Sequence, residues 1–81
     1  MMLSEIAQAL TQAVEEKREV VIHYWEGSID DAGLLQKYGR VTMFANATVW
    51  FVEDGDTVQK VIPLVNVKWV KLERFILNHL P

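Results

Sequence analysis

Short alternating segments fill this chain between Glu19 and Lys71, and they limit what it can fold into. The densest part, residues 40–56, reads RVTMFANATVWFVEDGD, with β-branched and aromatic residues in two runs and turn residues after each run. Asp54-Gly55 is the strongest turn signal, because Asp-Gly accepts the positive φ angles of a tight hairpin turn. The pattern predicts a mainly β fold, which is a small five-stranded, bent antiparallel sheet or barrel.

The alternation and its breaks place the five strands at about residues 19–25, 40–45, 48–53, 57–62 and 64–71. Pro63 separates the last two strands, because proline cannot donate a hydrogen bond to a strand ladder. Residues 28–38 contain Asp30, Asp31 and Gly33 and are predicted to form a loop. This loop is long for a hairpin connection, and long loops in compact domains are often functional.

A helix is predicted over residues 4–17, ahead of the strands. Apolar residues recur there at spacings of three and four, and they form one stripe made of Leu3, Ile6, Ala7, Leu10, Ala13 and Val14. Ser4 is expected to be the N-cap. Apolar residues and His79 recur at helical spacing near the end of the chain, so a short C-terminal helix is expected over 72–79.

The composition describes one small domain with more apolar surface than it can bury. The chain has 81 residues, no cysteine, and 51% hydrophobic residues. Without disulfides, a domain of this size often gains stability by association. We therefore expect an exposed apolar patch that marks an interface. The lack of cysteine is compatible with the reducing cytoplasm, which is the expected location.

Large aromatic residues are the candidate interface anchors. The chain has three tryptophans, Trp25, Trp50 and Trp69, and tryptophan is enriched among residues that dominate binding energy. Trp50 is the preferred candidate, since it alternates with Val49 and Phe51 in a hairpin whose two faces cannot both be core. The predicted protein-interface residues are Trp50, Trp25, Trp69 and Phe51.

Charge argues against broad nucleic-acid affinity. The formal net charge is −3, and eleven acidic residues outnumber eight basic ones, whereas binding to a polyanion depends on Lys and Arg. One local cluster, Lys37, Tyr38 and Arg40, could stack on a base and hold phosphate, as single-strand binders do. The alternative is a solvated loop end with a tyrosine at the edge of the core. No run approaches the roughly 18 apolar residues of a membrane span.

No motif in the sequence indicates catalysis, a cofactor or a metal. His23 lies inside an apolar run and is expected to be a half-buried strand residue, and His79 lies near the chain end. Asp30, Asp31 and the segment Asp54-Gly55-Asp56 lack the alternating ligand order of a calcium loop, so they are interpreted as turn residues. We therefore predict no enzyme activity, no cofactor and no metal site.

One helix followed by five short strands, the last two nearly continuous around Pro63, resembles the Sm-like small barrels. The closest resemblance is to the YolD-like family, short proteins of Gram-positive bacteria and their phages and plasmids. The residues that carry it are Val20 to Trp25, Gly39-Arg40-Val41, Thr48 to Val52, and Lys60 to Val70. The YolD-like resemblance implies an accessory role in DNA repair or in a mobile element. The Sm-like resemblance implies rings formed by edge-strand pairing, and RNA held by loops.

These observations favour a non-enzymatic protein-interaction or adaptor module. We expect it to form a homo-oligomer or to dock on a protein partner, with an accessory or inhibitor role and a phage or plasmid origin. The alternative is an Sm-like protein that binds single-stranded nucleic acid through Lys37, Tyr38 and Arg40.

Overall fold

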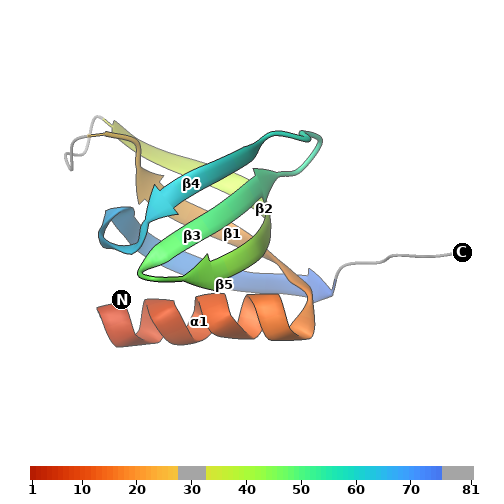
Figure 1. The fold of residues 1–81 in the computed structure, drawn as a ribbon, viewed down its shortest axis with the longest axis horizontal. Coiled ribbons are helices and arrows are strands. Elements are labelled where there is room, and N and C mark those ends of the chain that lie inside the picture. The colour runs from red at the N-terminus through yellow and green to blue at the C-terminus, as the bar shows by residue number, and fades with distance from the viewer. Residues whose placement is uncertain (28–32, 76–81) are drawn as a thin grey trace, which may run out of the picture.

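The computed structural model describes residues 1–27 and 33–75 of the chain. One helix comes first and five strands follow it (Figure 1). The elements are α1 (Leu3–Glu16), β1 (Arg18–Trp25), β2 (Leu34–Ala45), β3 (Thr48–Glu53), β4 (Gln59–Pro63), the 3-10 turn η2 (Leu64–Asn66) and β5 (Val67–Phe75). The fold is therefore mainly β with an N-terminal helix, as the alternation predicted.

All five strands form one antiparallel sheet in the order β4-β3-β2-β1-β5. The chain runs outward from β1 to β4 through neighbouring strands, and β5 then returns to the other side of β1. The sheet is strongly bent (Figure 1), but β4 and β5 do not pair, so it is an open sheet and not a closed barrel. Within the described residues, β4 and β5 are thus the two edge strands.

Helix α1 lies along one side of the bent sheet (Figure 1) and buries Ile6, Leu10 and Ala13 against it. The helix begins at Leu3, and the backbone N–H of Met2 donates to the Glu5 carboxylate at 2.9 Å. The prediction of Ser4 as the N-cap is therefore wrong, because Ser4 lies inside the first turn. The helix ends where Lys17 adopts φ 53°, which turns the chain directly into β1.

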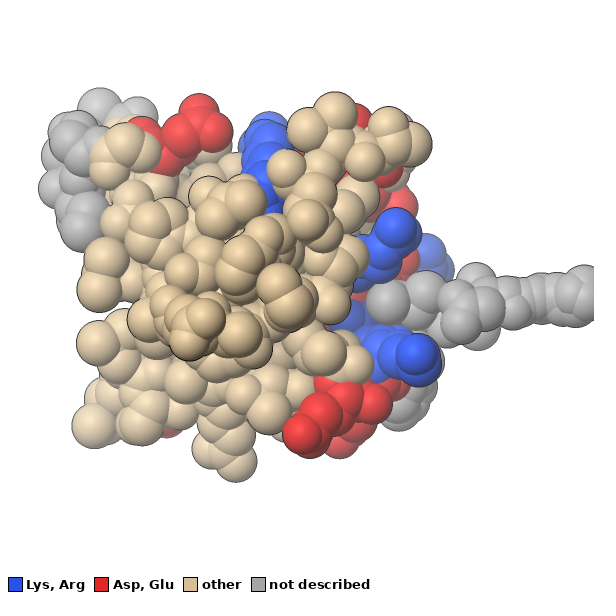
Figure 2. All heavy atoms as spheres, viewed as in Figure 1, with Lys and Arg blue, Asp and Glu red and all other residues tan. Residues whose placement is uncertain are grey.

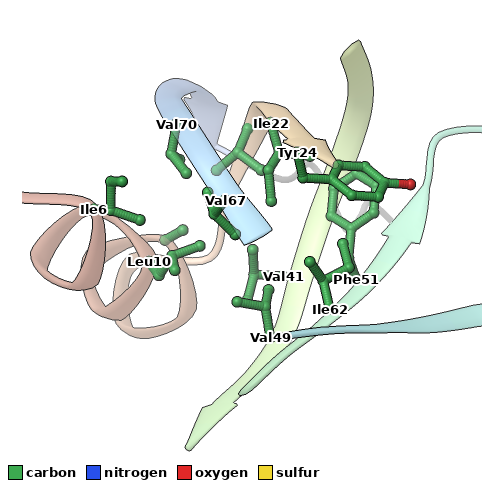
Figure 3. Close-up of a cluster of buried hydrophobic side chains, with 12 residues drawn as sticks. Ile6, Leu10, Ile22, Tyr24, Val41, Val49, Phe51, Ile62, Val67 and Val70 are labelled. Atoms are coloured by element: carbon green, nitrogen blue, oxygen red, sulfur yellow. The ribbon is translucent and has the colours of Figure 1, made fainter. Parts of the chain in front are cut away.

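The core fills the inner face of the sheet, which is the face turned toward α1. Alternate residues of β1 are buried (Val20, Ile22 and Tyr24), and the same alternation buries Val49 and Phe51 of β3. These side chains form one buried cluster with Ile6 and Leu10 of the helix, most of which is labelled in Figure 3. No described helix is long and apolar enough to cross a membrane.

Several predicted boundaries need correction. Strand β4 begins at Gln59 and not at residue 57, and residues 64–66 form η2, so β5 begins at Val67. Strand β2 begins at Leu34, so residues 34–38 are not loop, because Trp25 pairs with Leu34 and the ladder continues to Glu19 and Arg40. Residues 72–75 continue β5, where a helix was expected, because Val20 pairs with Leu72. The other part of that expected helix, residues 76–79, lies outside the described residues, as do Asp30 and Asp31.

Gly39 allows the close approach of β2 to β3. It is buried, and a Cβ atom built there would collide with the Val52 carbonyl oxygen and come within 2.9 Å of the Phe51 ring. The obstacle is backbone, which cannot rotate away as a side chain can. Only glycine therefore fits this position without moving a strand.

The Gly39→Ala variant is expected to lose about 3 kcal/mol of stability, because overpacking against a fixed backbone forces the strands apart. Gly55→Ala is the matched control. Gly55 has φ 84° and open space around it, so its alanine variant should lose only about 1 kcal/mol from backbone strain. Urea unfolding measures both. Equal losses in the two variants would contradict the close-approach argument.

Candidate functional site

An apolar stripe crosses the outer face of the sheet. Met43 of β2 pairs with Trp50 of β3, and Trp50 pairs with Val61 of β4, so the three side chains lie beside one another. Met43 is 45% exposed, Val61 is 59% exposed, and Trp50 is half-buried. We call these three residues the outer stripe. It ends on β4, an edge strand of the described sheet.

The outer stripe lies on strands whose surroundings carry few charges. Figure 2 views the molecule from the side on which β3 and β4 are nearest, and the centre of that face has no Lys, Arg, Asp or Glu, while charged residues gather toward its margins. Exposed apolar residues are also found at the start of the chain and on both sides of β4: Met1, Met2, Leu3, Val58 and Val65. The expected exposed apolar surface is therefore present.

The predicted interface residues fall in different places. Trp50 belongs to the outer stripe. Trp69 is half-buried and meets the His23 ring edge-on, with ring centroids 4.8 Å apart, and His23 is half-buried as expected. Trp25 is half-buried, with the Lys68 ammonium 5.8 Å from its ring.

Phe51 has no exposed surface, because it alternates with Trp50 and points into the core. The choice of Phe51 as an interface residue is therefore corrected.

The cluster Lys37, Tyr38 and Arg40 is divided by the pleat of β2. The Lys37 ammonium lies 3.7 Å from the Glu53 carboxylate, whereas the Tyr38 hydroxyl donates to Glu19 at 2.6 Å. Arg40 is exposed and pairs with Glu19 in the β1–β2 ladder. Two of the three side chains thus already engage carboxylates of the protein itself.

Glu19 joins three strands through one carboxylate. The same Oε1 atom accepts from the Tyr38 hydroxyl on β2 and from Arg74 Nε on β5, at 2.6 and 2.7 Å. The Tyr38 hydrogen bond, followed by the Arg74 hydrogen bond, lowers the pKa of Glu19 below its ordinary value, although partial burial opposes this. The same bond raises the pKa of Tyr38. Neighbouring positions in the sequence gave no sign of this contact, because 55 residues separate Glu19 from Arg74.

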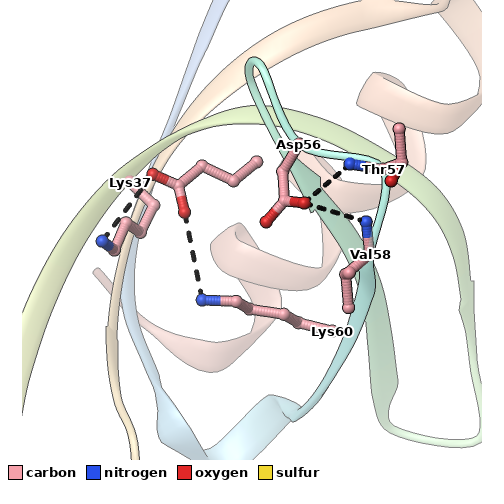
Figure 4. Close-up of polar contacts among 6 residues, drawn as sticks. Lys37, Asp56, Thr57, Val58 and Lys60 are labelled. Atoms are coloured by element: carbon pink, nitrogen blue, oxygen red, sulfur yellow. Dashed lines mark hydrogen bonds and ion pairs between the residues drawn. The ribbon is translucent and has the colours of Figure 1, made fainter.

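A second polar group lies on the inner face, toward one end of the core. The ammonium groups of Lys37 and Lys60 both approach the Glu53 carboxylate, at 3.7 and 3.9 Å (Figure 4). Tyr24 is close to this group, and burial raises the pKa of its hydroxyl while Lys60 opposes that rise. Sequence reasoning missed this arrangement, because its residues come from β1, β2, β3 and β4 and follow no spacing rule.

A cavity of about 290 Å³ opens beside this inner polar group. Its walls are residues 24–27 at the end of β1, residues 60–63 of β4, and Asn66 of η2. It therefore lies where the bent sheet brings the edge strand β4 near the end of β1 and η2. We call it the seam pocket.

The turn before β4 confirms the interpretation of Asp54-Gly55-Asp56 as turn residues. Asp56 Oδ1 accepts from the backbone N–H groups of Thr57 and Val58 at 2.7 and 3.1 Å (Figure 4). These bonds, with that from Val58 contributing most, lower the pKa of Asp56. In residues 1–27 and 33–75, no group of three or more His, Asp or Glu residues is placed to hold a metal ion.

Comparison with known proteins finds no match to this chain among family models, curated proteins or solved structures. The YolD-like and Sm-like resemblance therefore stays a prediction.

The Glu19→Gln variant should lower the melting temperature at pH 7 by a few degrees, because a neutral amide is a weaker acceptor for Tyr38 and Arg74. The folded-state pKa of Glu19 is lowered, so its stabilising effect is present above the unfolded pKa of about 4.3 and is lost as the pH falls through and below that value. The difference between the variant and the parent should therefore shrink toward pH 3. Thermal unfolding followed by circular dichroism between pH 7 and pH 3 measures this.

Glu15→Gln is the control for the acid-stability experiment, since Glu15 is exposed on α1. It should leave the melting temperature unchanged at pH 7. A Glu19→Gln difference that stays constant across the pH range would show that its ionisation has no part in stability.

Proposed function

We propose that this chain is a non-enzymatic interaction module that self-associates through the outer stripe and the free edge of β4. The observation that carries this proposal is the alignment of Met43, Trp50 and Val61 across three strands, ending at an edge strand. Half-exposed aromatic and aliphatic residues in one row are typical of a contact surface, since single scattered ones are normal but contiguous ones are not.

The edge of β4 supports this proposal because little on it prevents pairing. Natural edge strands are commonly protected by outward-pointing lysines or by prolines inside the strand. Lys60 instead points toward Glu53 on the inner side, and Pro63 stands only at the last position. Val61 is therefore the central, outward-facing residue of the strand.

A second copy of the chain is the occupant that this geometry favours. The described sheet has two different edges, β4 and β5, at opposite ends of its strand order. If the β4 edge of one copy pairs with the β5 edge of the next, the contact is head-to-tail, and repeated rotation can close it into a ring. On β5, the backbone N–H of Val70 reaches only the Met1 sulfur, at 3.5 Å, which is a weak acceptor that a strand carbonyl can replace.

The nucleic-acid alternative stays a prediction that no contact favours, because Lys37 and Tyr38 meet carboxylates of the same chain. A phage or plasmid origin, and an accessory or inhibitor role, rest on the family resemblance alone.

Val61→Lys should dissociate the assembly, because a lysine head group at the centre of the edge must be desolvated on pairing. Val61 is 59% exposed, so the variant should keep the fold. Val58→Lys is the matched control: Val58 is 61% exposed but precedes β4 and has no partner in the β3–β4 register. Light scattering across a concentration series is expected to show a parent oligomer, a monomeric Val61→Lys variant and an unchanged Val58→Lys variant. A monomeric parent at all concentrations would refute the proposal.

Trp50→Ala should weaken the same association about 30-fold, since truncating a central anchor costs roughly 2 kcal/mol or more. Sedimentation velocity gives the dissociation constant, and circular dichroism checks that the variant folds. An unchanged dissociation constant would remove Trp50 from the contact and leave only the strand edge.

A further inference from the structure

The seam pocket lies between the edge strand β4 and the end of β1. Residues 60–63 of β4 line it consecutively, and so do residues 24–27 at the end of β1. Because neighbouring strand residues point to opposite faces, a pocket lined by consecutive residues follows the edge of β4 and meets the end of β1, and does not lie on one face of the sheet. The Asn66 side chain closes one end by donating to the Trp25 and Gly27 carbonyl oxygens at 2.9 and 3.2 Å. The wall on the β1 side is therefore held in place before anything binds.

The most unusual group in the pocket wall is the Tyr24 hydroxyl. Tyr24 is only 2% exposed, and its buried hydroxyl makes no hydrogen bond of good geometry among the described residues, although the Lys60 ammonium is close enough to lower its pKa. Figure 3 shows this hydroxyl on the side of the core cluster away from α1. The indole Nε1–H of Trp25, the next residue along the wall, is also buried and unpaired. A buried donor without an acceptor is costly, so such groups are rare and need an explanation.

The charges of the described residues in the pocket wall cancel. Lys60 and Glu26 belong to its wall, and Glu53 lies between Lys60 and Lys37. Among the described residues that line the pocket, one is cationic and one is anionic, so the charge of this wall sums to zero. A charged ligand gains no net attraction here, whereas an uncharged one avoids desolvating an ion.

The remaining features describe what the pocket can hold. The indole N–H can only donate, and the tyrosine hydroxyl can donate, so the complementary group is a hydrogen-bond acceptor. Val61, Ile62 and Pro63 supply apolar wall on the β4 side. A volume of about 290 Å³ equals that of roughly ten water molecules, at about 30 Å³ each in the liquid.

We propose that the seam pocket is a binding site for a small uncharged molecule that carries a carbonyl or amide oxygen on a short apolar body. The Tyr24 hydroxyl donates to that oxygen, and the apolar body lies against Val61, Ile62 and Pro63. The site shares only Val61 with the outer stripe and needs no second copy of the chain.

Benzamide is the probe, with toluene, benzoate and benzylamine as comparators of similar shape. The first comparator lacks the acceptor, and the other two carry a negative or a positive charge. The readout is the Trp25 indole N–H signal in ¹H–¹⁵N spectra, assigned with Trp25→Phe. Benzamide is expected to shift this signal in a saturable way at millimolar concentration, and each comparator should bind at least fivefold more weakly.

Tyr24→Phe separates a binding role from a structural one. Removing an unpaired buried hydroxyl should leave the melting temperature equal or higher, while benzamide affinity should fall about fivefold, as expected for one lost hydrogen bond of about 1 kcal/mol. Tyr38→Phe is the matched control, because its hydroxyl bonds to Glu19 outside the pocket; it should leave benzamide affinity unchanged.

Three results would overturn this site: no saturable benzamide shift in the parent, toluene binding as tightly as benzamide, or unchanged benzamide affinity in Tyr24→Phe. The toluene comparison uses the parent protein and so decides the question even if the variant does not fold. Light scattering on the same samples reports self-association separately, so failure of either proposal is recognised independently of the other.

Discussion

The structure depends on the packing of one helix stripe against the inner face of a bent sheet. Ile6 and Leu10 of α1 reach the buried side chains of β1, β3 and β5, and together they form the one cluster of buried residues found in the described chain. A five-stranded sheet of this length has only one face that can be covered by a single short helix. The bend is what lets that helix contact several strands, and Gly39 lets β2 pack closely against the β3 backbone.

Helix α1 covers the inner face of the sheet. Side chains along each strand point alternately toward this face and away from it, so their position in the strand determines whether they are buried. Phe51 and Trp50 are neighbours, yet Phe51 is sealed in the core and Trp50 is left on the outside. The same rule places Lys60 inward, beside Glu53, and Val61 outward at the edge. Helix α1 covers only one end of the inner face. The other end is occupied by Tyr24, Lys37 and Lys60, which is why a polar group is found there.

Local patterns were enough to predict the helix, the hairpins and the existence of five strands. Strand β3, residues 48–53, has the predicted bounds, because a strong turn stands on each side of it. Prediction was wrong where distant pairing decides the outcome. Leu72 and Phe75 fit a helical spacing, but β1 holds this segment as a strand, and Arg18 Nε donates to the Glu73 carbonyl oxygen across the sheet at 2.9 Å.

The candidate sites differ in how far the sequence could reveal them. Trp50 could be found from alternation alone, because a two-faced hairpin must expose one of its aromatic faces. Its neighbours in the outer stripe could not be found, because the pairing of Met43 with Trp50 includes a register shift after Val41. The seam pocket was invisible for a similar reason, since 35 positions lie between Tyr24 and Lys60 and only the bend of the sheet brings them together.

Strand β4 is where the two proposed activities meet. Its outer face and edge carry Val61 of the outer stripe, and residues 60–63 also form a wall of the seam pocket. Pairing with a second copy reduces the conformational entropy of β4. A ligand that has already ordered β4 lowers this entropic cost, so the two proposed binding events are thermodynamically linked. The unpaired Tyr24 hydroxyl is consistent with such a design. A group that destabilises the free protein is tolerated where a bound partner satisfies it, because the same hydrogen bond then contributes to affinity in full.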